Sequence, residues 1–126
     1  MKDNFIKISG KVLQGERLGR RLGFSTANLD RENYVRRKLK IKLGVYSGLA
    51  ELSSGRKFKA GIVIGPIDKT GLPKIEAHLI GFKGNLYGKK LAVILKKYLR
   101  PFRKYKSVEK LKAQIAKDIE RVKIYG

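Results

Sequence analysis

The chain has 126 residues and no cysteine, which excludes disulfides, thiolate metal sites and thiol nucleophiles. Its single histidine, His78, excludes a metal site built from several histidines. Thirty-one Lys and Arg against ten Asp and Glu give a formal net charge of +21. This excess favours polyanionic partners such as nucleic acid, nucleotide phosphates or an anionic membrane, although it can also serve only to keep a small protein soluble.

The length and the hydropathy pattern describe an ordinary globular protein. A chain of this size can bury one hydrophobic core, so we expect a single domain over residues 1–126. The N-terminus has no signal-peptide pattern, and no apolar stretch is long enough to span a bilayer. We therefore expect a monomeric cytoplasmic protein that does not enter a membrane.

The first half of the chain shows strand patterns interrupted by two basic segments. Alternating apolar residues predict a strand over Phe5–Leu13, followed by a glycine-rich basic loop over Gly15–Gly23. Arg31–Lys42 is strongly basic and has no clear apolar period, so we expect an exposed excursion. Val45–Leu52 and Phe58–Ile64 read as a β-hairpin because the residues between them favour a turn.

The second half adds two strands and a helix. Lys74–Ile80 and Leu91–Leu99 read as strands. After Pro101, apolar residues recur every three or four positions from Val108 to Val122, which predicts an amphipathic helix with Ser107 as its N-cap. Five or six strands followed by one helix favour an antiparallel barrel or closed sheet.

One short segment combines the parts of a phosphate and metal site. The glycines between Gly15 and Gly23 surround three arginines, so backbone amides and guanidinium groups could face an anion, although a basic hairpin loop has the same composition. Thr26 and Asn28 offer two side-chain oxygens that suit Mg²⁺. Such a pair can equally cap a local turn.

Glu76 is an acidic residue inside an apolar strand. If its carboxylate faces the barrel interior or one mouth, it can act as a general base. The alternative is a solvent-facing carboxylate paired with a nearby lysine. His78 shares the face of Glu76 and is a better candidate for a packed side chain than for a catalyst.

The segment before the predicted helix interleaves basic and aromatic residues. Lys96–Lys106 could stack a flat heterocycle or bind single-stranded RNA. Its aromatic side chains could equally close the joint between strand and helix, and their spacing does not choose between these interpretations.

Taken in order, these motifs resemble the riboflavin kinase family of the bacterial and eukaryotic type. Gly19–Leu29 resembles the family's G-R-x-L-G-F-P-T-A-N-L signature, and Gly44–Tyr46 resembles its G-V-Y. Ile75–Leu79 and Leu86–Lys89 resemble I-E-x-H-L and L-Y-G-K. The end of the chain, from Tyr98 to Asp118, resembles Y-L-R-P followed by S-x-E-x-L-x-x-Q-I-x-x-D.

The resemblance implies a six-stranded Greek-key β-barrel with a C-terminal helix, which transfers the γ-phosphoryl group of ATP to the ribityl 5′-hydroxyl of riboflavin. By the family pattern Glu76 is the general base, and Thr26 and Asn28 coordinate Mg²⁺. Gly15, Arg20, Thr26 and Tyr87 contact or border the nucleotide. Arg100, Arg103 and Tyr105 border the flavin. Expected ligands are therefore Mg²⁺, ATP or ADP, and riboflavin or FMN.

Two departures from the family pattern stand out: Ser25 replaces the usual proline and Tyr105 the common phenylalanine. Bacterial relatives often carry an FMN adenylyltransferase domain, for which this sequence has no counterpart, so we expect FMN and not FAD as the product. The basic excess is not explained by the family. It supports an alternative, a basic barrel that binds RNA and keeps only residual kinase motifs.

Overall fold

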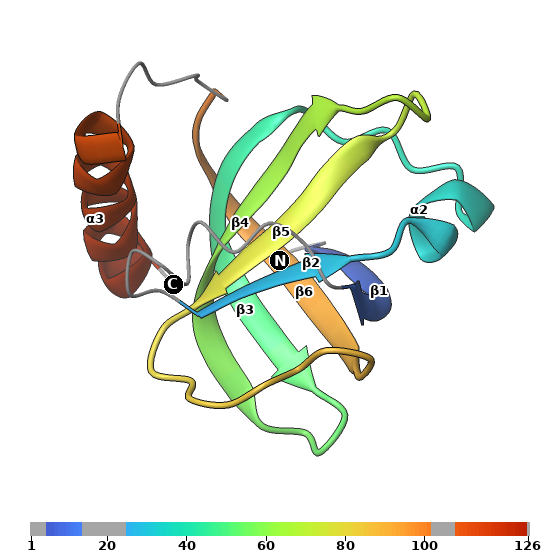
Figure 1. The fold of residues 1–126 in the computed structure, drawn as a ribbon, viewed down its shortest axis with the longest axis horizontal. Helices are drawn as coiled ribbons and strands as arrows, with labels where there is room; N and C mark the ends of the chain where they lie inside the picture. Colours follow the sequence, from blue (N-terminus) through green and yellow to red (C-terminus); the bar gives the residue numbers. More distant parts are fainter. Residues whose placement is uncertain (1–4, 14–24, 102–107, 126) are drawn as a thin grey trace.

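A closed antiparallel β-barrel forms the centre of the protein (Figure 1). The computed structural model describes residues 5–13, 25–101 and 108–125. Six strands in this part of the chain follow one another around the barrel in the order β1-β2-β5-β4-β3-β6. The elements are β1 (Ile6–Leu13), β2 (Ser25–Leu29), α2 (Glu32–Arg36), β3 (Gly44–Leu52), β4 (Lys57–Ile67), β5 (Pro73–Leu79), β6 (Lys90–Arg100) and α3 (Val108–Tyr125). The predicted fold class is confirmed.

The predicted strands are all present, and most run one to three residues further than expected. The strand β2 was not predicted as a strand, because five residues are too few to show an alternating pattern. The expected excursion over Arg31–Lys42 is exposed for the most part, as predicted, but it also contains the short helix α2, which was not predicted. The helix α2 has a single buried side chain, Tyr34, so its sequence shows no apolar period from which a helix could be predicted.

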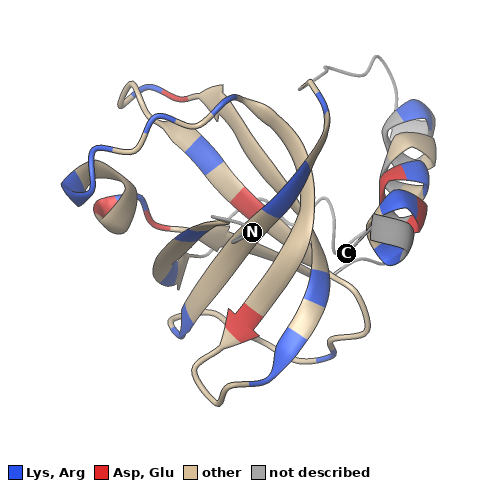
Figure 2. Ribbon diagram, turned by 180° about the vertical axis from the view of Figure 1, so that it is seen from behind, with Lys and Arg blue, Asp and Glu red and all other residues tan. Residues whose placement is uncertain are grey.

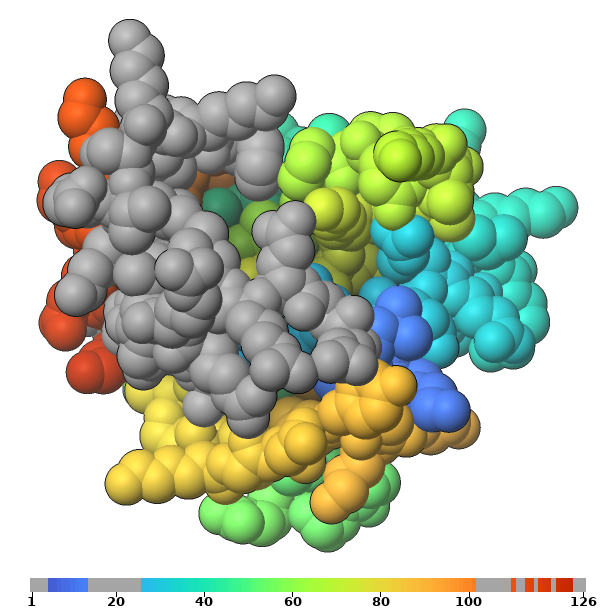
Figure 3. Space-filling model, in the orientation of Figure 1, coloured from blue at the N-terminus to red at the C-terminus, as the bar shows by residue number. Residues whose placement is uncertain are grey.

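The helices α2 and α3 lie on opposite sides of the barrel (Figure 1). Basic residues recur along the loop after α2 and on α3 (Figure 2). The turn between β4 and β5 lies next to the segment that contains α2 on one face of the molecule (Figure 3). Within the described ranges, neither helix is long and apolar enough to cross a lipid bilayer.

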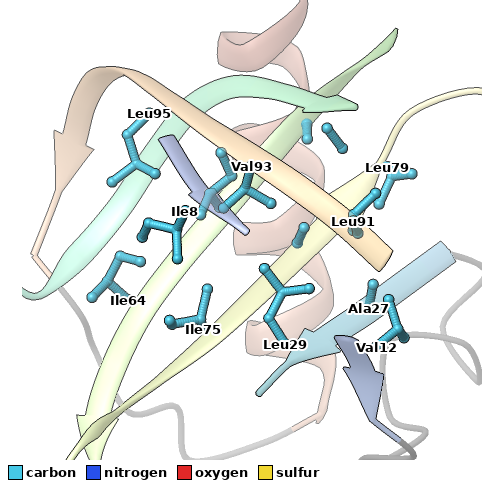
Figure 4. Close-up of a cluster of buried hydrophobic side chains, with 14 of the residues drawn as sticks. Ile8, Val12, Ala27, Leu29, Ile64, Ile75, Leu79, Leu91, Val93 and Leu95 are labelled. Atoms are coloured by element: carbon cyan, nitrogen blue, oxygen red, sulfur yellow. The ribbon is translucent and has the colours of Figure 1, made fainter. Parts of the chain in front are cut away.

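The barrel interior is filled by aliphatic side chains that alternate along each strand (Figure 4). In β5, for example, Ile75, Ala77 and Leu79 are buried in the interior, whereas the residues between them face outward. The largest fully buried side chains of this core are Ile8, Leu29, Ile62, Ile64, Ile75, Leu91 and Val93. The alternation therefore decides which polar side chains reach the outside of the barrel.

The helix α3 packs on the outer faces of β3, β4 and β6. Val122 of α3 is fully buried and packs with Val45 and Leu99. A bidentate ion pair adds to this contact: Arg100 Nε donates to Asp118 Oδ1 at 2.9 Å, and Arg100 Nη2 lies 2.6 Å from Asp118 Oδ2. These contacts fasten α3 to the end of β6.

We predict that Gly48→Ala lowers the free energy of unfolding by about 3 kcal/mol, because a Cβ atom there would overlap the backbone carbonyl of Ile94 on β6. Gly61→Ala is the matched control. Its Cβ would lie 3.6 Å from Val122 Cγ2, an ordinary contact, so a change below about 1 kcal/mol is expected. Urea denaturation followed by circular dichroism measures both. Equal stability of the two variants would contradict the prediction.

Candidate active site

Two neighbouring strands bring three polar side chains of the predicted site together with His78, which was not predicted as a site residue. In the ladder between β2 and β5, Asn28 is directly opposite Glu76, and Thr26 is directly opposite His78. Ala27 and Ala77, which lie between them, are buried in the barrel core. Directly opposed residues on one face of a sheet have Cβ atoms about 5 Å apart. The four polar side chains therefore form one compact set on the outer face of the barrel.

The outward position of Glu76 corrects the sequence-based expectation. Its carboxylate faces neither the barrel interior nor a mouth, because the buried residues of β5 are its odd-numbered neighbours Ile75 and Ala77. It is not an open surface residue either, since its side chain is 33% exposed and that of His78 is 13% exposed. The alternative expectation of a lysine partner is also wrong: the partner in the structure is His78.

Glu76 and His78 form a short polar contact, with His78 Nε2 3.0 Å from Glu76 Oε1. Burial is the largest single influence on this carboxyl and raises its pKa. The hydrogen bond from His78 and the charges of His78 and Lys74 together outweigh burial, so the pKa of Glu76 is lowered overall. Glu76 is therefore ionised at neutral pH, and its second oxygen can accept another hydrogen bond.

The second nitrogen of His78 has no partner within the described ranges. His78 Nδ1 is buried there without a hydrogen bond. The residue beside His78 on β4 is Gly61, where an added Cβ would lie 3.6 Å from Val122 Cγ2 of α3, and the residue beside Glu76 is Val63. The imidazole ring thus lies between the polar pair on β2 and the part of β4 covered by α3.

Thr26 and Asn28 provide one hydroxyl and one carboxamide oxygen on the face that carries Glu76. No cluster of three or more His, Asp or Glu side chains that could hold a metal occurs in the described ranges. Mg²⁺ is commonly held by one or two protein oxygens together with substrate phosphates and water. The donor set therefore fits a Mg²⁺ ion that is shared with a nucleotide, and does not resemble an all-protein metal cage.

Tyr87 lies in the loop between β5 and β6 and is 58% exposed. Its backbone N–H donates to Asn85 Oδ1 at 2.9 Å. The same loop is fastened to β1, because Gly88 N–H donates to the carbonyl of Val12 at 2.9 Å. Since the end of β1 also pairs with Asn28 of β2, Tyr87 is presented near the end of the barrel at which Thr26 and Asn28 lie.

Arg100 lies away from this set in the chain, at the end of β6, and its side chain is only 17% exposed. Its guanidinium group is held by Asp118, which in turn accepts a hydrogen bond from Gln114 Nε2 at 3.0 Å. Its expected role at the flavin remains a prediction. Gly15, Arg20, Arg103 and Tyr105 lie outside the described residues, so their expected roles also remain predictions.

Asp118 is a residue that the sequence analysis did not connect with Arg100. It is 8% exposed, and it is one of only ten acidic residues in the chain. The sequence did contain a signal for this pair. Asp118 lies in the predicted helix close to the apolar positions Ile115 and Val122, and a carboxylate that is buried is normally paired with a cation.

Comparison with known proteins agrees with this geometry. The family model for riboflavin kinase (flavokinase) matches residues 3–125. The bifunctional riboflavin kinase/FMN adenylyltransferase of Buchnera aphidicola subsp. Schizaphis graminum is 37% identical over 122 residues, which are 94% of this chain and 38% of that protein. The RNA-binding riboflavin kinase RibR of Bacillus subtilis is 35% identical over 119 residues, or 91% of this chain and 49% of the relative.

A solved structure shares the fold. The crystal structure of riboflavin kinase from Trypanosoma brucei superposes with a TM-score of 0.68 and 20% sequence identity, covering 97% of this chain and 81% of that one. The chain spans less than half the length of the two curated relatives named above. The family model, by contrast, matches nearly every residue, and the signature residues Thr26, Asn28 and Glu76 share one face of the barrel. The chain therefore belongs to the riboflavin kinase family.

Proposed function

We propose that the chain transfers the γ-phosphoryl group of ATP to the ribityl 5′-hydroxyl of riboflavin. A new bond forms between the hydroxyl oxygen and the γ-phosphorus, the bond to the β,γ-bridging oxygen breaks, and FMN and ADP result. The observation that carries this proposal is the β2–β5 register, which sets an ionised carboxylate directly opposite a carboxamide and beside a hydroxyl. Phosphoryl transfer depends mainly on such positioning and on charge stabilisation.

Glu76 is proposed to bind and then deprotonate the attacking hydroxyl. His78 occupies one carboxylate oxygen, which leaves the other to accept the hydrogen bond from the ribityl hydroxyl. The lowered pKa of Glu76 makes its carboxylate a weak base, because burial is outweighed by the hydrogen bond from His78 and the charges of His78 and Lys74. We therefore infer that it first orients the hydroxyl and takes the proton as the bond to phosphorus forms.

Thr26 Oγ1 and Asn28 Oδ1 are proposed to hold Mg²⁺ beside the phosphates of ATP. The ion, when bound, neutralises the charge of the β- and γ-phosphates. Because Asn28 lies opposite Glu76, the same short stretch of sheet would align the phosphate to be transferred with the hydroxyl that attacks it. Tyr87, which is exposed near this end of the barrel, is proposed to border the nucleotide.

RNA binding is the second candidate function, in the form of a barrel whose kinase motifs have decayed. One relative is named an RNA-binding riboflavin kinase, so the two activities are compatible in one protein. Thr26, Asn28 and Glu76 are all present and share a face, which supports a working kinase site and not a decayed one. We therefore propose that kinase activity is the primary function.

The first prediction is that the chain converts riboflavin to FMN when incubated with ATP and MgCl₂. Separation of the flavins by liquid chromatography with fluorescence detection measures the product. Replacing ATP by CTP or GTP tests the choice of donor in the same assay. Absence of FMN with every nucleotide would overturn the proposed function.

The second prediction is that Glu76→Gln lowers kcat at least about a hundredfold, because a positioned general base typically contributes a factor of 10² to 10⁴. The variant keeps the size of the side chain, so its melting temperature should stay close to that of the wild type. Glu51→Gln is the control, since Glu51 is a part-buried acid paired with Lys7 at 3.0 Å on another strand. An unchanged kcat in Glu76→Gln would remove this residue from the proposed role.

The third prediction is that Thr26→Ala raises the KM for Mg-ATP and the Mg²⁺ concentration needed for half-maximal activity, each at least about tenfold, while binding of riboflavin stays unchanged. Steady-state kinetics over a MgCl₂ titration measures both constants. Thr70→Ala serves as the control, because Thr70 is an exposed residue whose hydroxyl bonds Asp68 in the β4–β5 turn. Identical Mg²⁺ dependence in the wild type and Thr26→Ala would exclude Thr26 as a ligand.

A further inference from the structure

The basic segment after α2 has no part in the proposed kinase chemistry. We define the basic loop as residues 37–43, which contain Arg37, Lys38, Lys40 and Lys42 and no acidic residue. All four basic side chains are exposed, and the loop runs along the outside of the barrel (Figure 2). A run of this kind is often only a solvated face, so its surroundings decide whether it is a binding surface.

Three tyrosine hydroxyls hold the basic loop in one conformation. Tyr46 Oη donates to the carbonyl of Lys42 at 2.7 Å, and Tyr98 Oη donates to the carbonyl of Leu43 at 3.4 Å. Tyr34 Oη accepts from the N–H of Ile41 at 3.3 Å. Burial, followed by the neighbouring tyrosines, raises the pKa of Tyr46, so its hydroxyl remains a donor. The positive charges are thus carried by a loop whose backbone is held by three tyrosine hydroxyls.

A hollow of about 540 Å³ lies between the basic loop and the β4–β5 turn. Its lining is mostly apolar and consists of Tyr34, Leu39, Ile41, Leu43, Ile67, Leu72 and Pro73, with Gly71, Lys40 and Lys42 completing it. Arg31, which precedes α2, is bound to the β4–β5 side of this hollow, since Nη2 lies 2.6 Å from Asp68 Oδ2 and Nη1 donates to the carbonyl of Pro73 at 3.1 Å. We call this hollow the groove.

Several lysines on the two segments that form the groove have no acidic partner among the described residues. Arg31 and Arg36 are paired with Asp68 and Glu32. For Lys38, Lys40 and Lys69, by contrast, no carboxylate of the described residues lies within salt-bridge distance. Ile67 in the groove is 50% exposed, so an apolar surface lies open beside these charges. Unpaired cations on the segments that flank an apolar hollow attract an anion that also has a flat apolar part.

We propose that the basic loop and the groove bind single-stranded RNA. The phosphates contact Lys38, Lys40 and Lys69, and an unpaired base enters the groove, which combines charge attraction with apolar contact. A duplex cannot place a base in the groove, because the bases of a duplex are stacked in the interior of the double helix. An anionic membrane presents no group that fills a hollow, and RNA is the polyanion that is commonly single-stranded in cells. The groove includes only Pro73 of β5, and none of Thr26, Asn28, Glu76 and His78 lines it.

The test measures binding of a fluorescein-labelled twelve-nucleotide single-stranded RNA by fluorescence anisotropy between 50 and 300 mM KCl. The variant Lys38→Glu/Lys40→Glu is expected to bind at least tenfold more weakly than the wild type at 100 mM KCl. The slope of log Kd against log[KCl] should fall by about 1.4, because each lost phosphate contact on a single strand contributes about 0.7.

The matched control is Arg56→Glu/Lys57→Glu, at the end of the β3–β4 turn and the first residue of β4, at the opposite end of the barrel (Figure 1). It changes the net charge equally, so it measures the effect of charge without the proposed surface. Its affinity should fall less than threefold. Equal loss of affinity in the two double variants, or no binding by the wild type at 100 mM KCl, would overturn the proposal.

A second variant, Ile67→Ser, tests the groove. It should weaken binding about three- to tenfold at every salt concentration and leave the slope unchanged, because an apolar contact releases no counterions. Duplex RNA of the same sequence should bind more weakly than the single strand. Equal affinity for duplex and single strand, or stronger binding to phosphatidylserine vesicles than to RNA, would overturn the assignment. Thermal melting of every variant shows whether it is folded.

Discussion

The register between β2 and β5 is the constraint on which the proposed site depends. Side chains on a strand alternate between two faces, so burial of Ala27 and Leu29 places Thr26 and Asn28 outside. The same rule applied to β5 places Glu76 and His78 outside and opposite them. Two short strands with small residues at their centre thus assemble a hydroxyl, a carboxamide, a carboxylate and an imidazole without any long-range loop. The chemistry follows from where the core residues lie.

The structure also shows how one carboxylate keeps a defined partner in a chain with a net charge of +21. Glu76 is held by an imidazole two residues away on the same strand, and not by a lysine. Many of the basic residues lie away from Glu76. Some of the positive charge is neutralised in ion pairs such as that of Arg31 with Asp68, and some is displayed on the loop after α2.

Much of the fold could be read from the sequence, because alternating apolar residues mark strands and a three-to-four spacing marks α3. The short strand β2 and the helix α2 were not predicted, because five residues are too few to show a hydrophobic period and α2 has one buried side chain. Pairing across strands was also out of reach. Parity alone put Glu76 and His78 on one face, but whether that face was inside or outside depended on barrel closure. The partner of Arg100 depended on how α3 docks.

Closure of the barrel has a consequence for the durability of this arrangement. Each described strand is hydrogen-bonded on both sides, so none of them offers a free edge to another chain. If β2 shifted its register by one residue, its ladders with β1 and β5 would both break. Thr26 and Asn28 would then point into the apolar interior of the barrel. Within the described barrel, closure therefore protects the strands against slippage and against edge-to-edge pairing with another chain.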